Sequence, residues 1–135
     1  MFLFNLFRKE NVNELSGYNE RQAAKLLYTI FQDIKSRKDV NSTIDTLTEK
    51  IYYLAFRRTN KKIVKLGDAL NPLGNANNLA ESMKLSMRYT SVYSAIKKTI
   101  TGAIKNPEYS SISLYECENF LVMILQAMAD MINRI

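Results

Sequence analysis

The residues best suited to chemistry in this chain are cations gathered near tyrosines in its middle third. Five Lys and Arg side chains fall between positions 57 and 65 with no acid among them, and a pair of tyrosines shortly precedes them. Guanidinium and ammonium groups bind phosphates or carboxylates, and rings beside them stack on bases or anchor protein interfaces. We therefore predict a partner-binding or nucleic-acid-binding surface made of Tyr52, Arg57, Arg58, Lys61, Lys62 and Lys65.

The charge of the whole chain favours anionic partners, although a run of cations is also typical of a solvated helix face. The net charge is +6, and residues 1–67 hold 13 Lys and Arg against 7 Asp and Glu, whereas residues 68–135 hold 6 of each. The excess therefore lies in the first half. Nucleic acid, an anionic membrane face and an acidic protein all remain possible partners for it.

Acidic residues become frequent after Pro107 and provide an alternative partner surface of the opposite sign. This surface consists of Glu108, Glu116 and Glu118. Two of these acids are only two positions apart on an expected helix, so they point to different sides and do not form a metal site. Near a helix N-terminus, they are better explained as acids that favour the helix dipole.

The chain has few of the residue types on which catalysis usually depends. It contains no His and a single Cys, which removes His general bases, Ser-His-Asp and Cys-His systems, His-ligated metals and an internal disulfide. The four Gly never cluster into a nucleotide-binding loop. Cys117 lies between two carboxylates that oppose its thiolate. We therefore expect a protein that is not an enzyme, with no cofactor and no metal.

The elements that must position these residues are expected to be helices of one domain. A chain of 135 residues, 47% hydrophobic and 24% charged, is suited to a single globular unit spanning residues 1–135. Only 4 Gly and 2 Pro are present, fewer than a sheet protein with many turns needs. The sequence predicts an all-α bundle of about four to six helices with a mostly buried C-terminal helix.

The first half of the chain shows two amphipathic helical patterns. Apolar residues recur at three-and-four spacing over residues 18–38, with Ser16 as the expected N-cap. A second helix is expected to start at Ser42, because Asp45 three residues later resembles a capping box. It either breaks at residues 59–60, with a short helix following, or continues to Gly67.

The second half begins with a loop and continues with two long helices. Residues 67–78 are rich in Gly and Asn and predict an internal loop, and residues 106–113 predict a loop before the last helix. Ser113 and Glu116 form a full capping box that opens this helix. It is apolar nearly all round, so it is either the centre of the bundle or a surface for a partner or a second copy, with Met123, Met128 and Met131 as adaptable contacts.

The N-terminal residues 1–9 are very apolar and predict a short helix. They lack the basic flank and small-residue cleavage site of a signal peptide. We expect this helix to pack on the body, the alternatives being a membrane surface or a partner's groove. A lone Cys and no signal favour the cytoplasm, and the longest apolar run is too short for stable membrane insertion.

These observations leave three classes of function, all of them interaction roles. We expect most strongly an immunity or antitoxin-type inhibitor, in which a small protein neutralises a partner protein such as a toxin. The alternatives are a nucleic-acid-binding helical protein that uses the basic run, and a structural or regulatory subunit that forms a homodimer through the last helix.

Overall fold

The computed structural model describes residues 19–69 and 79–135, and every regular element within them is a helix. The prediction of an all-α bundle is therefore confirmed. Ser16, the expected helix at residues 1–9 and most of the expected loop at 67–78 lie outside the described residues. The elements are α2 (Glu20–Lys35), α3 (Asn41–Phe56), α4 (Leu66–Ala69), α5 (Leu79–Lys105), the 3-10 helix η2 (Pro107–Tyr109) and α6 (Leu114–Asn133).

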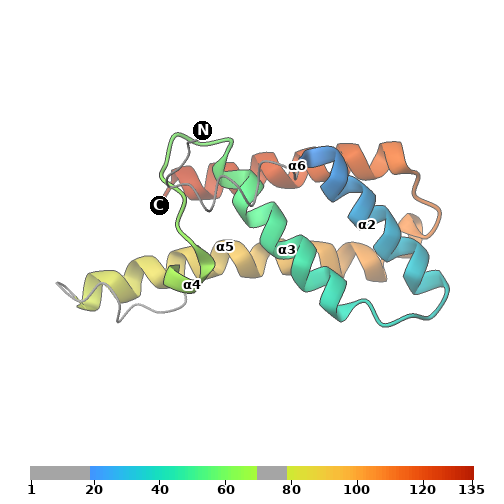
Figure 1. The fold of residues 1–135 in the computed structure, drawn as a ribbon, viewed down its shortest axis with the longest axis horizontal. Coiled ribbons are helices and arrows are strands. Elements are labelled where there is room, and N and C mark those ends of the chain that lie inside the picture. Colours follow the sequence, from blue (N-terminus) through green and yellow to red (C-terminus); the bar gives the residue numbers. More distant parts are fainter. Residues whose placement is uncertain (1–18, 70–78) are drawn as a thin grey trace, which may run out of the picture.

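The four long helices form two antiparallel pairs. α5 and α6 run along the length of the molecule, and α2 and α3 cross them obliquely (Figure 1). Both α3 and α6 contact all three of the other long helices, whereas α2 packs mainly on α6 and α5 mainly on α3. The core therefore lies where α3 and α6 meet, and these two helices supply many of its fully buried side chains.

The helix α2 begins at an Asn rather than at the expected Ser. The side chain of Asn19 accepts a hydrogen bond from the backbone N–H of Gln22 at 2.9 Å, and the Gln22 side chain accepts from the Asn19 N–H at 3.2 Å. This reciprocal capping box satisfies two N–H groups that a helix end leaves without partners. It fixes the orientation of the first turn of α2, which bears Glu20 and Arg21.

The predicted capping box at Ser42 and Asp45 is wrong. Helix α3 begins at Asn41 with Val40 as its N-cap, and this N-cap residue makes no side-chain capping hydrogen bond. Val40 is buried in the core, and the Asp39 carboxylate accepts from the Asn41 N–H at 3.0 Å. Burial of Val40 therefore places the helix start before Ser42, which lies within the first turn.

The basic run does not lie on a helix. α3 ends at Phe56, residues 57–65 are irregular, and α4 forms a single turn from residue 66. The alternative of one helix continuing to Gly67 is therefore wrong, and so is the interpretation of the run as a solvated helix face. Gly67 to Ala69, expected at the start of the internal loop, belong to α4.

The helix α6 begins as the sequence predicts. Ser113 Oγ accepts from the Glu116 N–H at 3.1 Å, and the Glu116 carboxylate accepts from the Ser113 N–H at 2.9 Å. Residues 106–113 connect α5 to α6 and contain η2, whose Asn106 cap precedes Pro107. Seven side chains of α6 are buried, including Leu121 and Ile124. The opposite face of α6 is exposed. The bundle therefore covers this helix on one side, and the helix is less buried than its apolar sequence predicts.

Candidate partner-binding surface

Two adjacent tyrosines of α3 hold the end of the basic segment against the bundle. The Tyr52 hydroxyl donates to the Val64 carbonyl at 2.9 Å, and the Leu66 N–H donates to the Tyr53 hydroxyl at 3.0 Å. Both rings are buried. Buried polar groups need such partners, so these two bonds fix the path of the chain between α3 and α4.

Tyr52 is therefore not an exposed binding residue, and its assignment to the binding surface is corrected. Its side chain is fully buried, and it packs edge-on against Tyr53 and Phe56 with ring centroids 5.3 and 5.1 Å away. Burial raises the pKa of its phenol well above the ordinary value, so the hydroxyl remains a donor. A ring in this position cannot stack on a base, but it positions the basic segment.

The first two cations of the run face the start of α2. Nε and Nη2 of Arg58 both donate to one carboxylate oxygen of Glu20, at 3.1 and 2.9 Å. The Arg58 side chain is 27% exposed, so this pair is partly shielded from water. Arg57 is the next residue toward α3 and is exposed. The pair links residues 38 positions apart and joins the basic segment to α2.

Three arginines line one hollow between the start of α2 and the end of α3. Its volume is about 510 Å³, and we call it the arginine hollow. Arg21 also lies 3.8 Å from the Glu118 carboxylate of α6. Among the residues that the structure describes, three arginines thus line the hollow and one acidic residue, Glu20, lies with them. These described lining residues are Asn19, Glu20, Arg21, Leu54, Arg57 and Arg58.

The lysines of the predicted surface lie apart from the arginine hollow. Lys61 is half-buried, and its backbone N–H donates to the Thr59 hydroxyl at 3.2 Å. Lys62 and Lys65 are exposed on the irregular segment. None of the three lysines lines the hollow. The predicted cations are therefore divided. Arg57 and Arg58 line the hollow together with Arg21, whereas the three lysines lie outside it.

The predicted acidic surface is divided among different structural roles. Glu116 closes the capping box, and its hydrogen bonds with Ser113 lower the pKa of the carboxyl group. Glu118 faces the first turn of α2 and pairs with Arg21. Glu108 is exposed at the start of η2. The structure thus directs these three acids to different neighbours.

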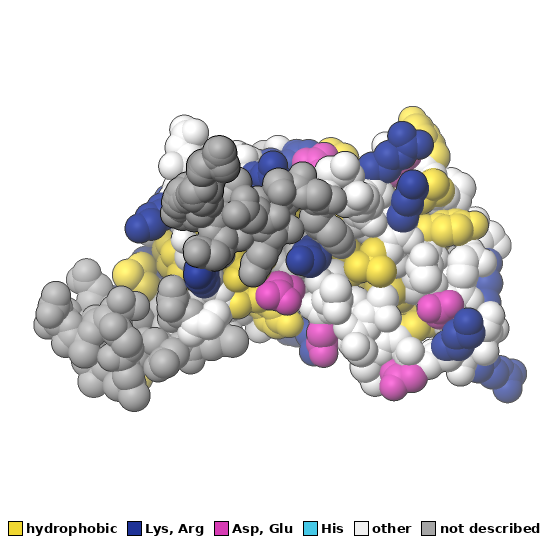
Figure 2. Space-filling view, in the orientation of Figure 1, with side chains coloured by type: hydrophobic (Ala, Val, Ile, Leu, Met, Phe, Trp, Pro, Cys, Tyr) yellow, Lys and Arg dark blue, Asp and Glu magenta, His cyan; other side chains and the backbone are white. Residues whose placement is uncertain are grey.

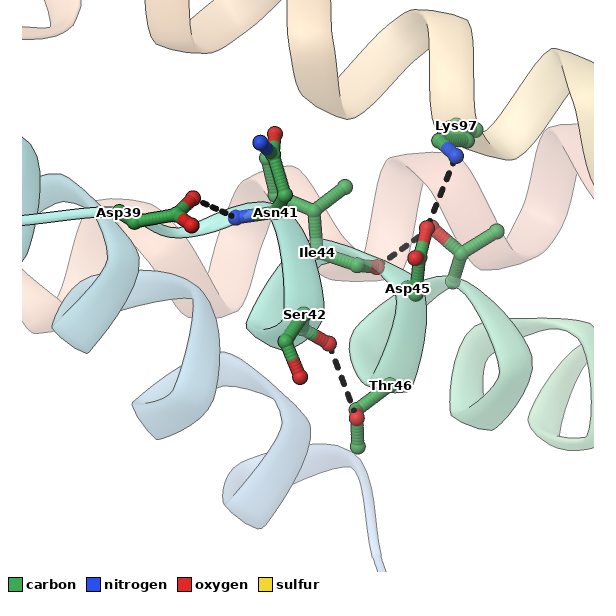
Figure 3. A network of polar contacts seen from close by, with 8 residues as sticks. Asp39, Asn41, Ser42, Ile44, Asp45, Thr46 and Lys97 are labelled. Carbon is green, nitrogen blue, oxygen red and sulfur yellow. Dashed lines mark hydrogen bonds and ion pairs between the residues drawn. The ribbon is translucent and has the colours of Figure 1, made fainter.

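A second basic groove, of about 630 Å³, runs along α5. Lys97 reaches from this helix to Asp45 on α3, with Nζ 2.8 Å from Oδ1, as Figure 3 shows. This hydrogen bond raises the pKa of Lys97. Lys98 and Lys105 line the same groove, and no carboxylate is among its described lining residues, which otherwise carry hydroxyl groups or are glycine. Two positively charged hollows therefore lie on different helices.

Metal-binding and nucleophilic chemistry find little support in the described residues. Within residues 19–69 and 79–135, no three His, Cys, Asp or Glu side chains gather as a metal site would require. Burial and the neighbouring Glu116 raise the pKa of the Cys117 thiol to about 11. A buried, protonated thiol is a poor nucleophile. No helix among the described residues is long and apolar enough to cross a membrane.

Figure 2 shows basic side chains spread among acidic and polar ones on the face drawn, instead of forming one continuous patch. The sequence did not single out Arg21, because it stands 36 positions before Arg57 and shows no local pattern with it. The sequence could have indicated Arg21 only by its position in the first turn of an expected helix.

No family model, curated protein or solved structure matches the chain.

Proposed function

We propose that the protein is a non-enzymatic binding domain that recognises the acidic surface of another protein through the arginine hollow. The observation that carries the proposal is the meeting of Arg21, Arg57 and Arg58 at one hollow, where Glu20 is the one acid among the described lining residues. Arg is among the residue types enriched at interface hot spots, and its planar guanidinium group pairs bidentately with carboxylates.

The charge pattern around the hollow favours a protein over a nucleic acid as the partner. Glu20 lies within it and Glu118 lies beside Arg21, so acids and bases alternate over a short distance. A nucleic acid presents a uniform row of phosphates, which these acids would repel. A protein can present both signs in a complementary pattern. The burial of Tyr52 also removes the ring that would stack on bases.

The form of binding that we propose is inhibition, as in an immunity or antitoxin-type protein that neutralises a toxin in the cytoplasm. Such a role needs a stable surface but no catalytic group. The arginine hollow meets this need because hydrogen bonds fix its walls. Asn19 and Gln22 fix α2, and the Arg58–Glu20 pair joins α2 to the basic segment.

The class of partner can be tested by capturing the tagged protein from a lysate of its own organism, with and without nuclease. We expect one stoichiometric protein to be retained in the nuclease-treated arm at moderate salt. Retention of nucleic acid alone, lost on nuclease treatment or at high salt, would contradict the proposal. That result would favour phosphate binding by the exposed Lys62 and Lys65 instead.

The inhibitor role has its own test once the partner is known. We expect the partner alone to slow growth when expressed in a host cell, and co-expression of this protein to restore growth. Unchanged growth inhibition despite a stable complex would mean that the protein binds its partner without neutralising it.

A further inference from the structure

The outer face of α6 is exposed along its whole length and carries a regular row of residues. The spacing of three and four positions places these residues on one side of a helix, opposite the buried Leu121 and Leu125. Near the middle of the row, Met123 is 69% exposed and the adjacent Val122 is 43% exposed. Tyr115, at the start of the helix, is 70% exposed. The row consists of Glu116, Asn119, Met123, Gln126, Asp130 and Arg134.

The charges at the two ends of this row are opposite. Glu116 stands at the start of α6 and Arg134 at its end, 18 residues later, which corresponds to about 27 Å of helix. If two copies of α6 lie antiparallel, Glu116 of each meets Arg134 of the other. If they lie parallel, like charges meet at both ends, which is unfavourable.

The middle of the row also suits an antiparallel copy. When Glu116 faces Arg134, Met123 of one copy comes opposite Ala127 of the other. Both residues are exposed, and a large side chain against a small one allows close approach of the two helices. In nearly the same register, the Asn119 amide of one copy can donate to the Asp130 carboxylate of the other.

We infer that the outer face of α6 binds the same face of a second copy, antiparallel and about a two-fold axis midway between Met123 and Ala127. Such an interface uses the same patch on both subunits and closes after two. One helix face buries less area than a standard stable interface, so the dimer is reversible and dissociates on dilution. Of the three methionines expected to make contacts, Met128 is buried in the core and Met131 is half-buried, which leaves Met123.

This inference concerns α6 and is independent of the arginine hollow. It is tested by sedimentation equilibrium of the full chain at low salt over a wide range of concentrations. We expect a monomer–dimer equilibrium for the unchanged protein. Arg134→Glu and, separately, Met123→Lys are each expected to weaken the dimer by about tenfold or more, because each places a charge where the opposing copy disfavours it.

A matched control is Lys98→Glu, which makes the same charge change as Arg134→Glu on the exposed face of α5. It should leave the dimer constant unchanged, and circular dichroism should show all three variants folded. A monomer at every concentration would overturn the inference. A dimer that both α6 variants leave intact would also overturn it, because another surface would then make the contact.

Discussion

At the scale of single residues, Tyr52 and Tyr53 have a different role from the cations that follow them in the sequence. The tyrosines anchor a loop, whereas the cations are candidate binding residues. Both tyrosines belong to the fully covered end of α3, and both hydroxyls hold backbone groups of the segment that follows. The sequence places Tyr52 near the cations correctly. It cannot tell a ring that binds a ligand from one that anchors a loop, because this depends on the path of residues 57–65.

Tyr52→Phe should destabilise the protein although it removes only one oxygen atom. The change leaves the Val64 carbonyl without its donor at a partly buried position, at a cost of about 1 to 3 kcal/mol in the free energy of unfolding. Urea unfolding monitored by circular dichroism measures this cost. The control is Tyr115→Phe on the exposed face of α6, which should have little effect. Equal effects of the two changes would contradict the anchoring role.

Cys117 should react slowly with Ellman's reagent while the protein is folded. Since its pKa is raised to about 11, the thiolate is the minor form at neutral pH. At pH 8 only about one thiol in a thousand is then ionised, and the reaction rate should rise steadily with pH toward 11. The unfolded chain in guanidinium chloride serves as the reference and should react about a hundredfold faster or more. Rapid reaction of the folded protein at pH 8 would contradict burial of this thiol.

At the scale of elements, the two Ser-containing capping motifs have different outcomes for a physical reason. Ser113 is exposed and ends a short connection, so its side chain is available to cap α6. Ser42 follows Val40, whose burial moves the start of α3 upstream. A local pattern can predict a helix start only where packing does not override it, and packing is not visible in a four-residue motif.

Ser113→Ala and Ser42→Ala should therefore differ in their effects on stability. The first removes the cap of α6 and should lower the free energy of unfolding by about 1 kcal/mol, whereas the second should leave it nearly unchanged. Denaturant unfolding of the two variants side by side measures the difference. A larger loss for Ser42→Ala would mean that α3 begins at Ser42 after all.

Neighbouring positions on α6 should likewise respond in opposite ways, because the helix has one buried side and one exposed side. Ile124→Ala should reduce the free energy of unfolding by about 2 to 4 kcal/mol, since the side chain is only 4% exposed. Met123→Ala should change it by less than about 0.5 kcal/mol at concentrations where the chain is monomeric. Thermal or urea unfolding gives both values. Similar losses at the two positions would contradict the orientation of α6.

At the scale of the whole molecule, the fold class and most of the helices could be predicted from the sequence, whereas the site could be predicted only in part. Apolar spacing, low Gly and Pro content and the Ser113 box are local signals, and they identify helices reliably. The arginine hollow depends on how α2 and α3 are placed against each other. The packing of these helices brings Arg21 and Arg57 together, and the spacing of residues in the sequence does not predict this packing.

The central claim is that the arginine hollow binds the partner, and charge reversal within it is the most direct test. The double variant Arg21→Glu with Arg57→Glu is compared with the matched double variant Lys98→Glu with Lys105→Glu, which makes the same change in net charge on the α5 groove. Each tagged variant is used to capture the partner from a nuclease-treated lysate, and the retained protein is quantified. We predict that the first variant loses the partner and the second retains it. Retention by the hollow variant, or loss by the α5 variant alone, would contradict the claim.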